Sequence, residues 1–169
     1  ALELAEGVTS VTADQRLELY TLKLLVRSRT ELFSNMDLTT LTALGHVDEA
    51  LNRARLRPSL TEKVDSFLEI FAVLQAHHAD TRACYATLQE HLALLTHPVQ
   101  RGLALVRLAA IFFEHTSPEA ARQLMGDVTA CITTAGRDVS QDLLVQYGSV
   151  LAFSGAITQV EATVLPRLE

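Results

Sequence analysis

The stretch FFEHTSPEAARQL, from Phe112 to Leu124, reads as the end of one helix, a short turn and the start of a second helix. Ser117 supplies an N-cap hydroxyl, Pro118 fits the first helical turn, and Glu119 suits the positive end of a helix dipole. The same pattern occurs in TALGHVDEALNRA (42–54), LQAHHADTRACYATL (74–88) and AFSGAITQVEATVL (152–165). The chain is therefore predicted to form one helical hairpin four times.

The four hairpins align on a residue five places after each turn. These anchor residues are Ala50, Ala83, Ala120 and Val160, and the turns carry Gly45, His78, His115 and Gly155. Leu41, Leu74, Ile111 and Leu151 stand nine places before the anchors, and Leu38, Phe71, Leu108 and Gly148 stand twelve places before them. These offsets lie on one face of a helix. A small anchor residue lets two helices cross closely, whereas a large side chain would separate them.

Composition supports an all-α domain and excludes several classes of function. The 169 residues are 49% hydrophobic and include only 7 Gly and 4 Pro, which is few for a turn-rich β protein. The net charge of −6 comes with no basic stripe, so we expect no nucleic-acid partner. No apolar run reaches the roughly 20 residues of a membrane span. The isolated Cys84 and Cys131 are expected to be buried thiols, which indicates a reducing cytoplasm.

The start and stop signals of helices predict nine helices, which fall into two parts of the chain. The helices are expected over residues 12–27, 30–44, 47–57, 61–76, 80–96, 98–114, 118–135, 139–154 and 158–168. Residues 1–29 form an N-terminal helical segment that does not fit the hairpin register, and residues 30–169 form the repeat array. Because the chain lacks an initiating Met, we expect a piece of a longer protein or a processed product.

GHVDEAL (45–51) and TSPEAAR (116–122) resemble the motif of tetratricopeptide (TPR)-like repeats. The resemblance covers about residues 30–169 and is degenerate, because no Trp opens a first helix and two spacings exceed 34 residues. It implies a right-handed α-solenoid of antiparallel helical hairpins with about 8–9 helices, in which the first helix of each hairpin lines a groove. The longer repeats are similar to those of the maltose-regulator type.

Catalytic and metal-binding motifs are missing from the sequence. The six histidines include no HExxH motif, and the histidines near the turns are expected to cap helix ends rather than bind a metal. Neither cysteine has a nearby histidine, and no GxSxG motif or phosphate-binding glycine loop is present. We therefore expect no enzyme activity, no metal and no cofactor. A helical-bundle enzyme is left open as a third class of function, beside the two non-enzymatic ones described next.

The outward positions of the first helices predict an apolar groove. Its partner-binding residues are predicted to be Leu68, Leu105, Phe112, Phe113, Val145 and Phe153, with Phe112 more exposed than Phe113. One interpretation is an interaction module that binds a peptide, a helix or a neighbouring domain there. In the alternative, the array is a sensory or regulatory arm of a larger protein, such as a bacterial transcription regulator or ATPase. Neighbouring repeats could also cover this strip, and homo-oligomers could form through the apolar face or the array ends.

Overall fold

The computed structural model describes residue 22, residues 36–115 and residues 117–168. The chain divides into two compact units, residues 1–37 and residues 38–169, and the fold described here is that of the second unit. The predicted helix 12–27 (apart from helical Leu22), the first residues of the predicted helix 30–44 and the predicted boundary at residue 29 lie outside the described residues.

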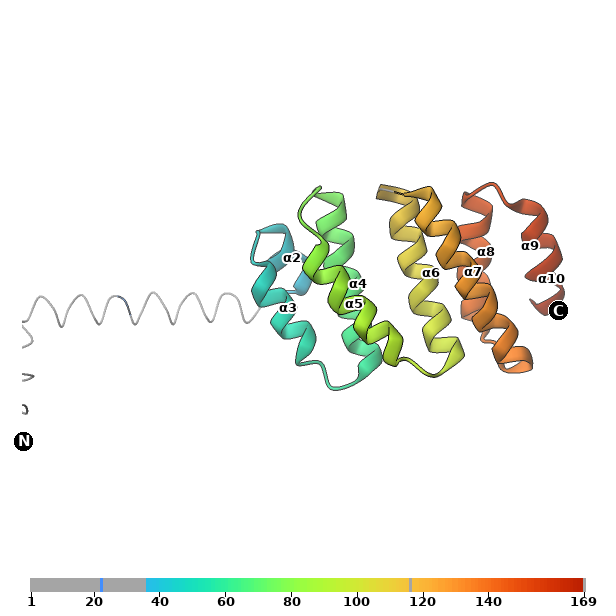
Figure 1. Cartoon of the computed structure of the whole chain (residues 1–169), viewed down its shortest axis with the longest axis horizontal. Helices are drawn as coiled ribbons and strands as arrows, with labels where there is room; N and C mark the ends of the chain where they lie inside the picture. Colours follow the sequence, from blue (N-terminus) through green and yellow to red (C-terminus); the bar gives the residue numbers. More distant parts are fainter. Residues whose placement is uncertain (1–21, 23–35, 116, 169) are drawn as a thin grey trace, which may run out of the picture. The chain divides into compact units, whose positions relative to one another are not determined.

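Every regular element in the described part of the second unit is a helix, as the composition predicts (Figure 1). The elements are α2 (Leu38–Ala43), α3 (Val47–Arg55), α4 (Leu60–Ala76), α5 (Arg82–Leu94), α6 (Pro98–His115), α7 (Pro118–Ala135), the 3-10 helix η2 (Gly136–Asp138), α8 (Gln141–Phe153), α9 (Ile157–Thr163) and α10 (Leu165–Leu168). The helix predicted over residues 158–168 is interrupted at Val164. Pro166 explains the interruption, because proline has no N–H to continue a helix and its ring displaces the preceding turn.

Serine side chains begin three of these helices. Ser59 and Glu62 form the predicted capping box, in which the N–H of Glu62 donates to Ser59 Oγ at 3.2 Å and the N–H of Ser59 donates to Glu62 Oε2. Ser117 caps α7 through the N–H of Ala120, with Pro118 in the first turn. Ser140 caps α8 in the same way.

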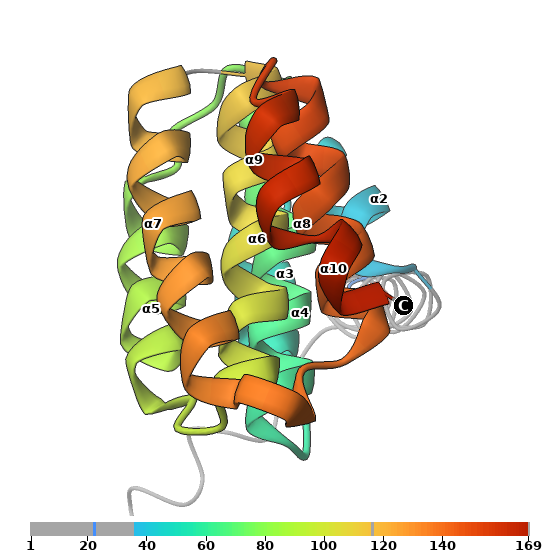
Figure 2. The same ribbon diagram turned by 90° about the vertical axis from the view of Figure 1, so that its right-hand side faces the viewer.

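Consecutive helices pack as hairpins, and the first helices of the hairpins also pack on one another. α2 contacts α3, α4 contacts α5, α6 contacts α7, and α8 contacts α9. The first helices α2, α4, α6 and α8 contact each other in chain order. Figure 2 shows α5 and α7 in a column beside α4 and α6. The second unit therefore has a layer of first helices with second helices packed against it.

The core lies between these two layers and contains several aromatic side chains. The Phe71 ring of α4 stacks on Tyr85 of α5, with ring centroids 5.4 Å apart. Phe112 of α6 meets both rings edge-on at 5.6 and 5.7 Å. Tyr147 of α8 is also buried, and its hydroxyl lies 2.7 Å from Thr129 Oγ1 on α7. Aromatic packing and this hydrogen bond thus connect successive hairpins.

Candidate interaction surface

The turns inside the four hairpins share one hydrogen-bond pattern, which aligns the hairpins. In each turn an N–H donates to the carbonyl oxygen five residues earlier: His46 to Leu41, Ala79 to Leu74, Ser117 to Phe112 and Ala156 to Leu151, at 2.9–3.0 Å. Gly45, His78 and Gly155 precede three of these donors and have φ values of 83°, 52° and 81°. A residue with positive φ followed by this bond is the Schellman motif that ends many helices.

This common turn corrects part of the predicted alignment. Phe112, rather than Ile111, is the equivalent of Leu41, Leu74 and Leu151, because α6 extends to His115. The predicted turn residue His115 is therefore the last residue of α6, and the turn lies one place later than predicted. In the second hairpin, two additional residues, Asp80 and Thr81, separate the turn donor Ala79 from the start of α5.

The correction also moves two of the anchor residues. Ala50 is fully buried as expected, but Ala83 is exposed and Ala120 is half-buried. The buried small residues at the equivalent positions are Cys84 and Ala121. The predicted closely packed positions exist, but in the second and third hairpins they lie one residue later.

Equivalent positions on the first helices α4, α6 and α8 form a row along each helix, which we call the linking row. We number positions from the residue whose carbonyl oxygen accepts the turn hydrogen bond, which is Leu74 on α4, Phe112 on α6 and Leu151 on α8. The linking row consists of the residues ten, six and two places before this acceptor and the residue directly after it, called −10, −6, −2 and +1. These are Val64, Leu68, Ala72 and Gln75 on α4; Gly102, Val106, Ala110 and Phe113 on α6; and Gln141, Val145, Ser149 and Ala152 on α8. A Cβ placed on Gly102 would lie 2.8 Å from Leu143 Cδ2 of α8, which shows the row of α6 facing the next first helix.

Burial of the linking row differs between the inner helices and α8. At the −6 position, Leu68 and Val106 are each 1% exposed, whereas Val145 is 48% exposed. Gln141, Ser149 and Ala152 are exposed as well. We call these four α8 residues the open strip. The equivalent residues of α4 and α6 are covered by the hairpin that follows each of these helices.

The six predicted groove residues have different environments. Leu68 is buried because it belongs to the linking row of α4, and this agrees with the alternative that neighbouring repeats cover the strip. Leu105 is buried because it occupies the core position that Phe67 and Leu144 occupy on α4 and α8. The expectation that Leu68 and Leu105 lie on the surface is therefore wrong.

The four other predicted residues reach the surface to different degrees. Phe112 and Phe113 are both half-buried, and Phe112 packs on Phe71 and Tyr85, so Phe112 is not a freely exposed ring. Val145 and Phe153 are exposed, Phe153 to 74%. The exposed apolar residues of the predicted groove are thus gathered on α8.

A polar pocket of about 230 Å³ crosses α4, α6 and α8, and the sequence analysis did not identify it. Its lining includes Asp65 of α4 and Arg107 of α6, which form an ion pair between the two helices. Asp142 and Gln146 of α8 line the same pocket, and Gln146 Nε2 donates to Asp142 Oδ2 at 3.3 Å. This face of the first helices therefore carries charged and polar side chains as well as apolar ones such as Leu103.

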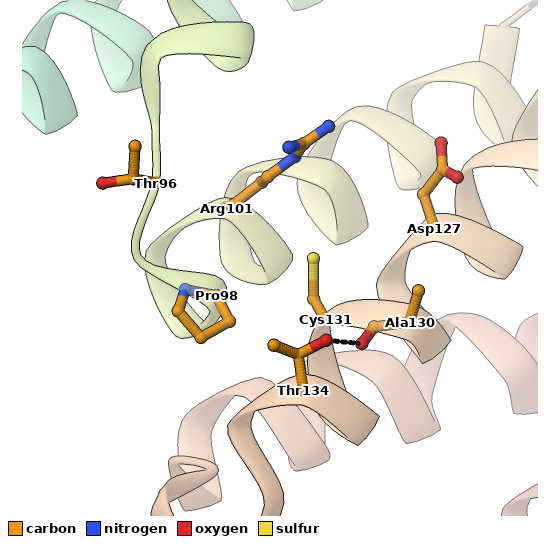
Figure 3. A pocket seen from close by; sticks show the side chains of 7 residues that line it. All are labelled: Thr96, Pro98, Arg101, Asp127, Ala130, Cys131 and Thr134. Atoms are coloured by element: carbon orange, nitrogen blue, oxygen red, sulfur yellow. Dashed lines mark hydrogen bonds between the residues drawn. The ribbon is translucent and has the colours of Figure 1, made fainter.

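A second pocket, of about 270 Å³, lies between the start of α6 and the C-terminal half of α7 (Figure 3). Arg101 and Asp127 line it beside the Cys131 thiol. Burial raises the pKa of Cys131, although the Arg101 guanidinium opposes this effect. Burial also raises the pKa of Cys84, to about 12. Both thiols therefore stay protonated at neutral pH and are poor nucleophiles.

Comparisons with models of protein families, with curated proteins and with solved structures find no match. Among the described residues, no three His, Cys, Asp or Glu side chains are grouped so that they could hold a metal ion. Within the same ranges, no helix has the length and apolarity needed to cross a bilayer.

Proposed function

We propose that this chain is a TPR-like helical-repeat module that binds a protein partner and has no catalytic role. Four hairpins with the same internal turn, whose first helices contact in chain order, support a right-handed solenoid. Such an array offers a preformed surface, so a partner binds without a large cost of ordering the array. A scaffold of this kind suits the cytoplasm, where Cys84 and Cys131 would remain reduced.

The open strip is the observation that carries this proposal. Val145 is the equivalent of two residues that the fold buries almost completely, yet about half of its surface faces solvent. Phe153 lies two helical turns further along α8 and is exposed to a greater extent. Covering such apolar side chains in a complex contributes up to about 1.5–3 kcal/mol for each residue.

In the second candidate function, the array is a sensory or regulatory arm of a larger protein. The same strip would then receive a neighbouring domain, and the contact would change with the state of that protein. The exposure of Val145 and Phe153 supports both candidates. They differ in whether the occupant belongs to the same polypeptide.

Site-specific photo-crosslinking in cells tests the proposal. A photo-reactive amino acid replaces Ser149, in the middle of the open strip, or Gln89, an exposed residue of α5 that serves as the control. We expect a discrete crosslinked protein from position 149 only, and we expect Val145→Arg to abolish it. Equal products from both positions, or a product that Val145→Arg leaves unchanged, would contradict a binding role for this strip.

A further inference from the structure

We infer that the open strip accepts an amphipathic α-helix supplied by a partner chain, docked on α8 as α8 is docked on α6. This inference rests on the proposed function and adds the chemical nature of the partner. It continues an interface that the fold already contains, because α6 packs on α4 and α8 packs on α6.

The contact of α8 with the preceding hairpin shows what a docking helix needs. Leu143 lies against Gly102 on the first helix α6. Four residues later, Tyr147 reaches the second helix α7, where its hydroxyl meets Thr129 Oγ1 at 2.7 Å. Residues four apart lie on one face of a helix. The partner helix is therefore expected to carry two bulky apolar side chains at this spacing, one for each helix of the last hairpin.

The open strip suits a helix with one apolar face. It has no charged side chain, and its Ser149 and Ala152 are small enough for a second helix to approach closely. Val145 adds an apolar side chain that is 48% exposed.

An extended peptide would fit the open strip less well than a helix. A helix satisfies its own backbone hydrogen bonds, whereas an extended chain needs donors and acceptors from the surface that it covers. Val145 and Ala152 offer no polar side-chain atoms, and Ser149 Oγ already donates to the Val145 carbonyl oxygen at 2.9 Å. An extended backbone would therefore lose hydrogen bonds to water and regain few.

A folded second copy also lacks the required apolar row. In the folded chain Leu143 and Tyr147, which make this contact inside the array, are 0% and 1% exposed. A copy could present them only by unfolding its last hairpin. The occupant is therefore a helix whose apolar face is free, rather than the folded last hairpin of a second copy.

A stapled peptide provides a direct probe. It copies residues 140–154 of this chain and is held helical by a staple between positions 142 and 146, which are less buried in the array than Leu143 and Tyr147. A fluorescent label reports its binding to the full chain by anisotropy. We expect saturable binding that Val145→Arg or Ser149→Arg weakens by about tenfold or more, a loss of about 1.4 kcal/mol.

Two controls separate docking from unspecific association. Gln89→Arg adds the same charge on exposed α5, so it should leave the affinity unchanged. A peptide with Leu143→Ser and Tyr147→Ser keeps the staple but lacks the apolar row, and it should not bind. Melting temperatures of the three protein variants show that each remains folded.

Three results would overturn the inference: no binding of the stapled peptide, equal binding to wild type and Val145→Arg, or a dimer of the full chain that Val145→Arg dissociates. Each result has a different consequence for the proposed function. If position 149 still crosslinks a partner while the helical peptide does not bind, the binding function stands and the helical mode fails. If neither signal is found, both proposals fail.

Discussion

Val→Ala substitutions at two equivalent positions test the alignment of the hairpins. Val106 and Val145 occupy the same linking-row position on α6 and α8, but they are 1% and 48% exposed. Val106→Ala removes two buried carbon groups at about 0.8 kcal/mol each, and the resulting cavity raises the loss to about 2–3 kcal/mol. Val145→Ala removes half-solvated atoms and gains helix propensity, so its effect should stay within about 0.5 kcal/mol.

Urea denaturation followed by far-ultraviolet circular dichroism measures both free energies of unfolding. The slope of the free energy against urea concentration should be the same for wild type and both variants, which makes the midpoints comparable. We expect the Val106→Ala midpoint to fall clearly and the Val145→Ala midpoint to remain near that of wild type. Equal losses from the two variants would refute the view that α8 presents an uncovered linking row.

Four further predictions concern the interior and the turns. Tyr147→Phe should lower the free energy of unfolding by about 1–2 kcal/mol in urea titrations, because it removes the buried hydroxyl that bonds Thr129 and Gln159. Gly102→Ala should be less stable in thermal melts than Gly126→Ala by about 1–3 kcal/mol, since an added Cβ meets Leu143 at position 102 and nothing within 4 Å at position 126. His78→Gly should stabilise the chain by about 1 kcal/mol in the same melts, because His78 has positive φ where glycine, as Gly45 and Gly155, occupies two of the other turns; a loss of stability would contradict this. Cys84 should resist alkylation in the native protein and react in denaturant, as measured by mass spectrometry, because burial keeps its thiol protonated; rapid native labelling would show that α5 opens readily.

The helices and their starting residues could be predicted because these signals are local. A serine followed three residues later by a glutamate begins α4, and Ser117 with Pro118 begins α7, as the sequence indicates. The periodicity of apolar residues then fixes which face of each helix is buried. Neither signal depends on residues that are distant in the chain.

The register between hairpins was harder to predict because it depends on the length of each turn. Ala120 and Ala121 are both small, and only the packing of α7 shows that Ala121 is the buried one. In the second hairpin the buried small residue is Cys84, which follows an exposed alanine. A one-residue change rotates a helix by about 100°, so an error of this size exchanges surface and core positions.

The exposure of the candidate interaction surface could be predicted only in part for a related reason. An apolar stripe on a helix shows that something covers it, but not whether the cover is the next hairpin or a partner. Leu68 and Val145 have the same chemical character and differ only in what lies beside them. The polar pocket was missed because Asp65 and Arg107 are 42 residues apart and meet only when α4 packs on α6.

The composition of the open strip reflects two opposing physical requirements. Where the linking row is covered, on α4, it holds Val64 and Leu68, but on α8 the equivalents are Gln141 and Val145. Polar residues at two of the four α8 positions keep the exposed apolar patch small, which limits unspecific association of the free chain. Val145 retains an apolar side chain at a position that is almost fully buried on α4 and α6. Both features suit a surface that is stable in water and, as we propose, binds a helix.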